Sequence, residues 1–184
     1  MFVFILPLLV DLASGGSSQS DTPLELRNAT WQDLKDFLTT SQETWLTKYN
    51  KPISIFCIRR EPIWHRGNNY SFYKWYRTGA PQSKIRQSAK ISAETEWPTM
   101  TIIYQNQRVE EGEVQVLRYW NPNETCAVFT LRDGTCAQYA WKSKLENTPV
   151  CDGVYKKMCR FTYPVFKPSC IRNVGICLNA RSWC

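Results

Sequence analysis

Eight cysteines carry the most reactive side chains in this sequence, and their chemistry is cross-linking. They stand at Cys57, Cys126, Cys136, Cys151, Cys159, Cys170, Cys177 and Cys184. An even number of cysteines is typical of a disulfide framework, whereas zinc sites usually show a CxxC pair or paired histidines. No CxxC pair occurs here, and the single histidine is His65. We therefore expect four disulfides and no bound metal.

Groups for covalent or acid–base catalysis are few. One histidine in a predicted loop, together with cysteines that can all pair, leaves no Ser-His-Asp or Cys-His arrangement. The adjacent carboxylates Glu110 and Glu111 fit a solvated turn better than an acid–base couple. The sequence thus predicts a protein that is not an enzyme and uses no cofactor.

The beginning of the chain predicts secretion. Residues 1–10 (MFVFILPLLV) are apolar and precede small residues at 13–16, the pattern of a signal peptide cleaved after residue 15 or 16. A short buried helix is the alternative for this run. Three sequons predict N-glycosylation at Asn28, Asn69 and Asn123. Signal, cysteines and sequons agree on a secreted, extracellular protein.

The formal net charge is +7 at pH 7, and the positive residues are spread along the sequence. Scattered basic residues in a secreted chain do not predict a nucleic-acid site. This balance suits an anionic small ligand, an acidic partner or a glycan surface, and charge alone does not choose among them. Beyond residue 16 no run approaches the ~18 consecutive apolar residues of a membrane helix, so we expect no membrane span.

Hydrophobic periodicity predicts one β-rich domain. Residues 17–29 are polar and predict a flexible segment, and residues 30–38 have helical spacing with Thr30 as N-cap. Eight strand-like segments follow, at 43–50, 53–60, 70–78, 84–94, 99–105, 113–120, 126–132 and 135–143. Because short turns join them, we expect a mainly β fold, an eight-stranded antiparallel up-and-down barrel. A β-sandwich is the alternative.

A second helix is predicted over residues 149–161. Thr148 is its expected N-cap, Pro149 suits the first helical position, and Val154, Met158 and Phe161 share one side that would pack on the barrel wall. The tail at 164–184 has no strong period and predicts an extended strap. We divide the chain into a signal peptide (1–16), a flexible segment (17–29) and one domain (30–184).

This order of elements resembles the tick salivary lipocalins, the histamine-binding-protein family. The resemblance is carried by TWQDL at 30–34, by Cys57, and by CAVFTLRDGTCAQYAW at 126–141 followed by Cys151 and Cys170. It implies a secreted lipocalin of tick saliva that removes a host mediator from solution, with a short N-terminal helix and a C-terminal helix on the barrel wall.

Two disulfides recur in that family, and the resemblance implies them here as Cys57–Cys170 and Cys126–Cys151. A third pair, Cys136–Cys159, is then geometrically reasonable, because two cysteines flank a hairpin and two lie about two turns apart on the helix. Cys177 and Cys184 remain as the fourth pair.

The family's amine-binding motif is altered in this sequence. Members that bind biogenic amines carry acidic residues where this chain has Ala127 and Tyr139. An amine cation brought into the barrel without a counter-charge would lose its hydration with little return. We therefore do not expect histamine or serotonin at these positions, although another acid could substitute.

The resemblance also implies which residues face the interior. If Ala127 and Tyr139 point inward, alternation brings Phe129, Leu131 and Trp141 with them and turns Cys126 and Cys136 outward. The third strand has two plausible inner faces, Tyr73, Trp75 and Arg77 on one side and Tyr70, Phe72, Lys74 and Tyr76 on the other; we assign the first. The expected ligand-binding residues are Phe56, Ile58, Arg60, Tyr73, Trp75, Arg77, Leu117, Tyr119, Phe129, Tyr139 and Trp141.

An apolar pocket with one or two arginines predicts a small hydrophobic or amphipathic anion of the fatty-acid or leukotriene class. Aromatic residues in strands also serve as plain core, so a filled barrel is the competing interpretation. Two alternatives in function remain. One is a biogenic-amine binder, and the other is a barrel that frames a surface for a host immune or complement protein. We expect a monomer.

Overall fold

A computed structural model describes residues 28–79, 81–104 and 107–172. The predicted signal peptide, most of the predicted flexible segment and the expected Cys177–Cys184 pair lie outside these residues. Among the described residues no helix is both long and apolar enough to cross a membrane.

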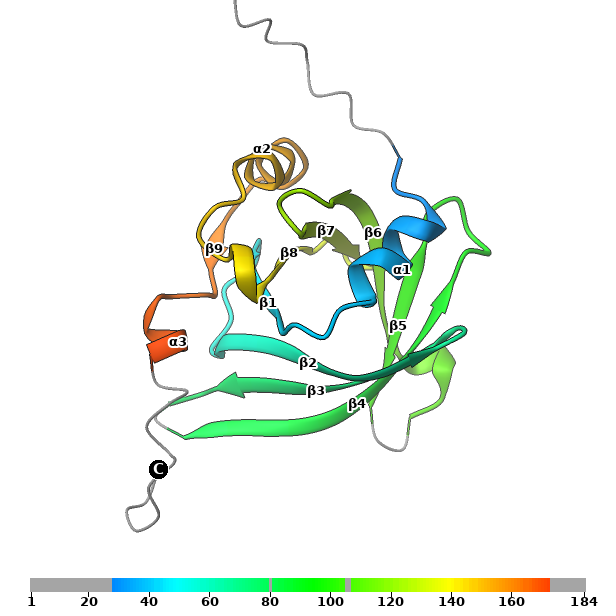
Figure 1. Cartoon of the computed structure of the whole chain (residues 1–184), viewed down its shortest axis with the longest axis horizontal. Coiled ribbons are helices and arrows are strands. Elements are labelled where there is room, and N and C mark those ends of the chain that lie inside the picture. The colour runs from blue at the N-terminus through cyan, green and yellow to red at the C-terminus, as the bar shows by residue number, and fades with distance from the viewer. Residues whose placement is uncertain (1–27, 80, 105–106, 173–184) are drawn as a thin grey trace, which may run out of the picture.

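Eight antiparallel strands form a closed barrel (Figure 1). They are β1 (Thr44–Tyr49), β2 (Phe56–Arg66), β3 (Asn69–Arg77), β4 (Gln82–Ser92), β5 (Thr99–Ile103), β6 (Glu113–Asn121), β7 (Cys126–Leu131) and β8 (Cys136–Trp141). From β2 to β8 each strand pairs with the next along the chain, and β1 pairs with β8 on one side and with β2 on the other. The predicted up-and-down barrel is confirmed, and the sandwich is wrong.

The β1–β2 contact that closes the barrel is brief. Only Thr44 opposite Arg60 and Trp45 opposite Arg59 pair there. Beyond this point β1 pairs with a strand that the sequence did not predict, β9 (Tyr163–Pro164). The predicted extended strap therefore contains a strand, and it also contains the short helix α3 (Ser169–Arg172). Two 3-10 turns, η1 (Val109–Glu111) and η2 (Lys142–Lys144), complete the described elements.

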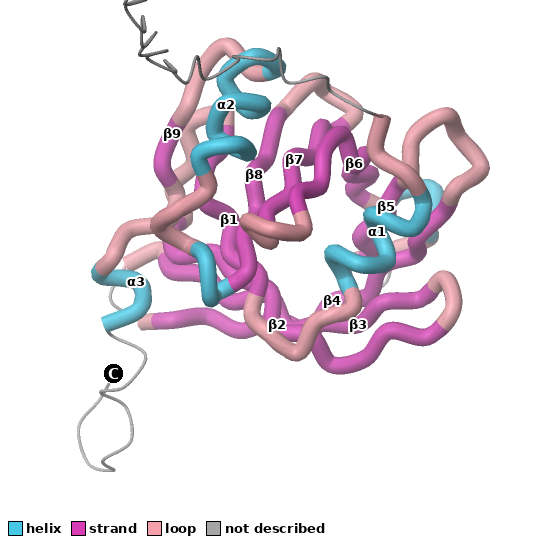
Figure 2. Tube along the Cα trace, turned by 45° about the horizontal axis from the view of Figure 1, so that its top comes forward, coloured by secondary structure: helices cyan, strands magenta, loops and turns pink. Residues whose placement is uncertain are grey.

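Helix α1 (Trp31–Leu38) lies across one end of the barrel (Figures 1 and 2). It begins with the predicted capping box, in which Thr30 and Asp33 each bond the other's backbone N–H. Its apolar side is fully buried, and Phe37 contacts Phe129 and Trp120 at ring distances of 5.4 and 5.5 Å. The helix and these rings fill that end of the barrel.

Helix α2 (Pro149–Met158) lies outside the barrel against β6, β7 and β8 (Figure 2). Val154 and Tyr155 are buried beneath it, whereas Met158 and Phe161, which were expected on the same buried side, are exposed. The helix ends at Met158, so the predicted end at residue 161 is wrong and Phe161 lies beyond the helix. Three of the expected disulfides are confirmed: Cys57–Cys170, Cys126–Cys151 and Cys136–Cys159. Two of them join α2 to the barrel wall.

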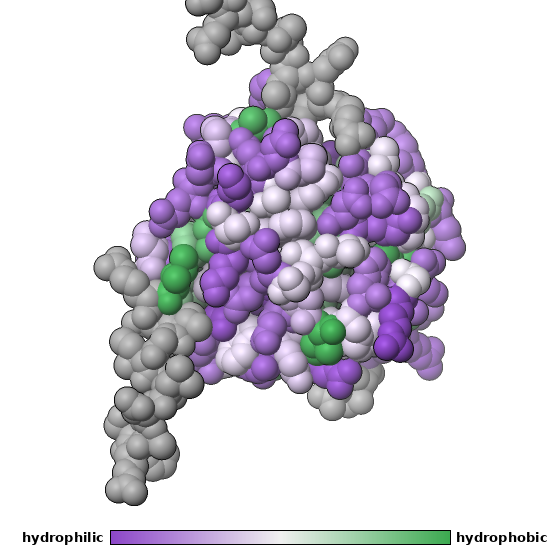
Figure 3. All heavy atoms as spheres, in the orientation of Figure 1, coloured by the Kyte–Doolittle hydropathy of each residue, from purple (hydrophilic) through white to green (hydrophobic). Residues whose placement is uncertain are grey.

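The surface in view in Figure 3 is mostly hydrophilic, with small and separated hydrophobic patches. The apolar side chains gather instead in one cluster inside the barrel and in two smaller clusters outside it, under α2 and under the C-terminal strap. A candidate ligand site must therefore be sought in the barrel interior.

Candidate functional site: a polar cavity inside the barrel

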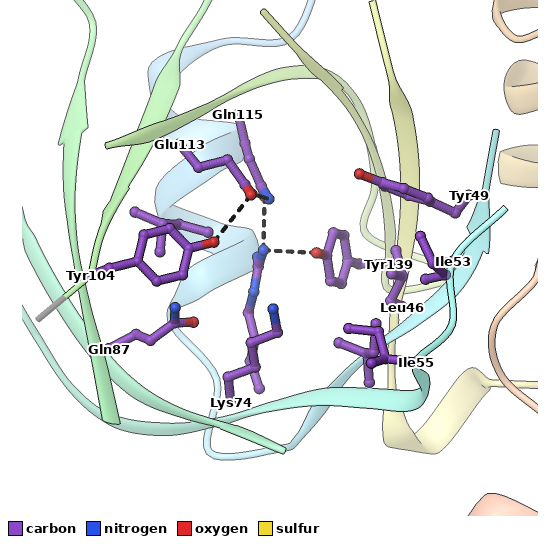
Figure 4. Close-up of a pocket in the computed structure, with 13 residues that line it drawn as sticks. Leu46, Tyr49, Ile53, Ile55, Lys74, Gln87, Tyr104, Glu113, Gln115 and Tyr139 are labelled. Carbon is purple, nitrogen blue, oxygen red and sulfur yellow. Dashed lines mark hydrogen bonds between the residues drawn. The ribbon is translucent and has the colours of Figure 1, made fainter. Parts of the chain in front are cut away.

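A cavity of about 100 Å³ lies inside the barrel (Figure 4). It is smaller than the roughly 300–1,000 Å³ of sites that enclose drug-sized ligands. Its apolar lining is Leu46, Tyr49, Ile53, Ile55, Ile58 and Ile102. Its polar lining is Arg60, Lys74, Gln87, Tyr104, Glu113, Gln115 and Tyr139. The cavity is thus more polar than the sequence predicted.

Arg60 is the central polar group of this cavity, and it is 3% exposed. Its Nη2 atom donates hydrogen bonds to Gln115 Oε1 and to the Tyr139 hydroxyl, each at 2.8 Å. Its guanidinium also lies 4.1 Å from the centroid of the Tyr139 ring. Its Nη1 atom is buried and has no hydrogen-bond partner among the described residues. One side of the guanidinium is therefore fixed, and the other retains an unused donor.

Lys74 adds a second cation beside Arg60. The two residues are direct cross-strand partners of β2 and β3, and both line the cavity. Burial lowers the pKa of Lys74, and the charge of Arg60 acts in the same direction, although Glu113 opposes it. Like charges directly opposite each other destabilise a sheet. The two neighbouring cations therefore repel each other, and a negative charge between them would reduce this repulsion.

Glu113 is the one carboxylate among the residues that line the cavity. It accepts hydrogen bonds from the Tyr104 hydroxyl at 3.2 Å and from Gln115 Nε2 at 2.6 Å. Burial, followed by the charge of Glu113, raises the pKa of Tyr104 to about 12. The sequence has no acid at positions 127 and 139 but left open that another acid could substitute, and Glu113 is such an acid in the cavity lining. Glu113 comes from β6, outside the family motif.

The predicted orientation of β7 and β8 is confirmed. Phe129 and Tyr139 lie in the inner cluster, while Cys126 and Cys136 lie in the outer ones. The predicted site residues inside the barrel then fall into two groups. Ile58, Arg60 and Tyr139 line the cavity. Leu117, Phe129 and Trp141 belong to the filled end beside α1, where Trp141 Nε1 donates to the backbone oxygen of Phe37 at 3.2 Å.

The assignment of the third strand is wrong. Tyr73, Trp75 and Arg77 lie on its outer face, where Lys84 Nζ is 3.7 Å from the Tyr73 ring and 4.5 Å from the Trp75 ring. The inner face carries Tyr70, Phe72, Lys74 and Tyr76. Both faces of this strand carry aromatic residues, so alternation alone could not separate them.

Two further predicted site residues, Phe56 and Tyr119, pack against the outer clusters. The sheet register shifts between Phe56 and Arg59 and again between Leu117 and Tyr119. At each shift one strand has an extra residue, so the inside–outside alternation changes phase there. Residues before and after the shift therefore cannot be assigned to a face by counting in twos. At the first shift Cys57 has a φ of 53°. Simple alternation was therefore wrong at both positions.

Four lining residues were not predicted from the sequence: Gln87, Tyr104, Glu113 and Gln115. Lys74 was placed on the wrong face of β3. Gln87 precedes the buried residues Ala89 and Ile91 at two-residue steps, and Gln115 precedes Leu117 in the same way. Polar residues in phase with a buried apolar series are the signal that could have revealed a polar interior.

An antiparallel eight-stranded up-and-down barrel, closed at one end by a helix and holding a cavity, defines the lipocalin fold. Two solved structures share it. Japanin from Rhipicephalus appendiculatus, solved with cholesterol, matches with a TM-score of 0.55 and 11% identity, over 72% of this chain and 97% of its own. AM182, solved with serotonin, matches with a TM-score of 0.56 and 15% identity, over 71% of this chain and 85% of its own.

No protein-family model and no curated protein sequence matches the chain. At these identities the structural likeness establishes the fold, and the expected resemblance to tick salivary lipocalins is confirmed at that level.

Proposed function

We propose that this protein is a secreted lipocalin of the tick salivary type that sequesters a small amphipathic anion in its barrel. The observation that carries the proposal is a pair of cations in the cavity lining. Arg60 and Lys74 lie directly opposite each other on the adjacent strands β2 and β3, and both line the cavity. Arg60 is buried and Lys74 is partly buried, and they share the cavity lining with a single carboxylate, so basic groups outnumber acidic ones there. A ligand with an acidic head group would relieve that imbalance.

The unused donors of the cavity suit such a head group. Arg60 Nη1 and Gln87 Nε2 are both buried, both line the cavity and both lack a partner among the described residues. A buried donor without an acceptor costs about 1–3 kcal/mol, which a carboxylate placed against it would recover. The carboxylate would then be held on one side by fixed groups, because Tyr139 and Gln115 already orient Arg60.

Cavity size limits how the remainder of the ligand fits. About 100 Å³ accommodates an acidic head group and a short part of a chain. Ile53, which is 37% exposed, lines the cavity together with Ile55. We propose that the apolar tail of a fatty acid or a leukotriene leaves the cavity past these two side chains.

Secretion is part of the same proposal. Residues 1–16 would act as the signal peptide, and residues 30–184 would form the mature lipocalin domain. The three disulfides support an oxidising extracellular environment.

Glu113 favours a second candidate, an amine ligand. Its carboxylate lines the cavity beside Tyr104 and could pair with an ammonium group. Against this candidate, the two cations nearby would repel an amine, and Glu113 already accepts two hydrogen bonds.

Titration of the purified protein with leukotriene B4, palmitate, serotonin and histamine in one buffer tests the proposal. We expect an acid to bind and Arg60→Gln to weaken that binding on the order of tenfold or more, since a charged hydrogen bond contributes about 1.5–3 kcal/mol. Arg132→Gln is the matched control, because Arg132 is exposed in the β7–β8 turn. Tight serotonin binding without acid binding would support the amine candidate and contradict ours.

A further inference from the structure

Positive charge is concentrated on three neighbouring strands of the barrel wall. Strands β2, β3 and β4 carry Arg59, Arg60, Arg66, Lys74, Arg77, Lys84, Arg86 and Lys90. Glu61 is the one carboxylate in these strands. Arg60 and Lys74 point into the cavity. The other six cations therefore lie on the outer face, independently of the ligand site.

Four of these outer cations are exposed, and they form a basic row. Lys84, Arg86 and Lys90 follow each other along β4 on its outer face. Residues two apart in a strand are separated by about 6.8 Å, so the three span about 20 Å. Arg66 extends the row sideways, because Asn69 pairs with both Arg66 and Lys90. We call Arg66, Lys84, Arg86 and Lys90 the basic row.

Most of this charge is not neutralised within the protein. Arg66, Arg86 and Lys90 form no ion pair with any residue that the structure describes. Glu61 is engaged by the Trp75 indole N–H at 2.6 Å and by Lys84 at 3.5 Å. Nearby carboxylates therefore do not cancel the positive electrostatic potential of these cations, and it extends into the solvent.

A series of cation–π contacts on the outer face ends at Lys84, one member of the basic row. Four residues directly opposite one another cross the outer face from β1 to β4: Trp45, Arg59, Trp75 and Lys84. Cations and rings alternate in this series at 5.1, 4.8 and 4.5 Å. Cation–π contacts of this length are attractive. They orient Lys84, one of the four members of the basic row.

We propose that the basic row binds a linear sulfated polysaccharide of the glycosaminoglycan type. A chain with regularly spaced sulfates complements cations spaced along one strand, and release of its counterions would supply the affinity. An anionic membrane would also be attracted, but membrane-surface segments usually insert a large apolar side as well. The neighbouring Ile63 and Trp64 are only 38% and 37% exposed. The glycan is therefore the occupant that the surface fits better.

Binding of a size-defined heparin oligosaccharide at several salt concentrations tests this proposal. All proteins carry Asn69→Gln, because a glycan on Asn69 would lie between Arg66 and Lys90. For the triple variant Arg66→Gln/Arg86→Gln/Lys90→Gln we expect binding weaker by on the order of tenfold near 0.15 M salt and a salt slope smaller by about three, close to one per cation. The matched control, Lys156→Gln/Lys157→Gln/Arg160→Gln, removes the same charge from exposed positions on and after α2 and should change affinity by less than about threefold.

Three results would overturn the proposal: no heparin binding, an equal loss in the control, or binding to phosphatidylserine vesicles in place of heparin. Circular dichroism verifies that each variant is folded. If the triple variant does not fold, Arg86→Gln against Arg160→Gln provides the same comparison. Leukotriene titration is expected to be unchanged by the triple variant, which separates this surface from the cavity.

Discussion

At the scale of single residues, Arg60 connects the two halves of the cavity. Its Nη2 bonds to Gln115 and Tyr139, and Gln115 in turn donates to Glu113, so one continuous chain of hydrogen bonds crosses the barrel. Hydrogen bonds linked in this way polarise one another in a low dielectric. The chain orients Arg60, and the buried Nη1 atom of Arg60 has no hydrogen-bond partner among the described residues.

Ala127 shows how burial limits the transfer of the family motif. It is 0% exposed and lies opposite Trp120 in the filled end of the barrel, not on the cavity. We expect Ala127→Asp to destabilise the protein by about 3 kcal/mol or more and to create no amine site, because the new charge would be buried without a partner. Urea denaturation and serotonin titration measure both effects, and Ala127→Ser is the control for added size. A stable variant with new serotonin affinity would contradict this placement.

At the scale of elements, α2 is held to the wall by charge as well as by disulfides. The Glu124 carboxylate, from the β6–β7 turn, accepts the backbone N–H groups of Val150 and Cys151 at 3.0–3.1 Å. These N–H groups belong to the first turn of the helix, where unpaired donors and the helix dipole favour an anion. The sequence predicted that the Thr148 side chain would cap this helix, but it makes no capping hydrogen bond. Glu124, from the β6–β7 turn, accepts the N–H groups of the first turn instead.

Removing this negative charge should loosen the helix. We expect Glu124→Gln to lower the free energy of unfolding by about 0.5–2 kcal/mol, the usual range for loss of a cap. Thermal denaturation with disulfides intact measures the change. Glu146→Gln is the control, since Glu146 is exposed and bonds to no described residue. Equal effects of the two substitutions would show that the carboxylate of Glu124 does not stabilise α2.

The elements were more predictable from sequence than the site. All eight strands, both main helices and three disulfides follow from local periodicity and from the resemblance. The inner face was correct for β7 and β8, where cysteines mark the outside, and wrong for β3, where Tyr73 and Phe72 offer equal hydrophobicity. It was also wrong at Phe56 and Tyr119, because register shifts depend on pairing with a neighbouring strand. Local sequence does not contain that information.

At the scale of the whole molecule, one end of the barrel interior is a packed core and the other contains the cavity. Helix α1 and its aromatic neighbours fill one end, and polar residues line the cavity beyond them. The solid end supplies the packing that an empty barrel would lack, and the disulfides add cross-links on the outside. Among the predicted aromatic residues, Phe129 and Trp141 thus belong to the core, whereas Tyr139 lines the cavity.

Tyrosines buried in different parts of the molecule predict a loss of stability at alkaline pH. Burial raises the pKa of Tyr70, Tyr104 and Tyr155 from 10.0 to about 12 in the native protein. The native state then holds these protons more tightly than the unfolded chain does. The free energy of unfolding should thus be maintained below about pH 10 and decrease as the pH rises from about 10 to 12. Phenolate absorbance and denaturation at each pH measure this, and native phenols that titrate near pH 10 would contradict it.

The short strand β9 completes the wall where β1 and β2 separate. The backbone N–H of Val165 donates to the backbone oxygen of Thr47, and the backbone oxygen of Val165 accepts from the N–H of Cys57. Nearby, a disulfide joins Cys57 to Cys170, two residues that are 113 positions apart in the sequence. Strands β1 and β2 therefore acquire these partners only after the segment around Val165 has been synthesised. Because contacts between residues far apart in sequence form slowly, we expect this part of the wall to close late in folding.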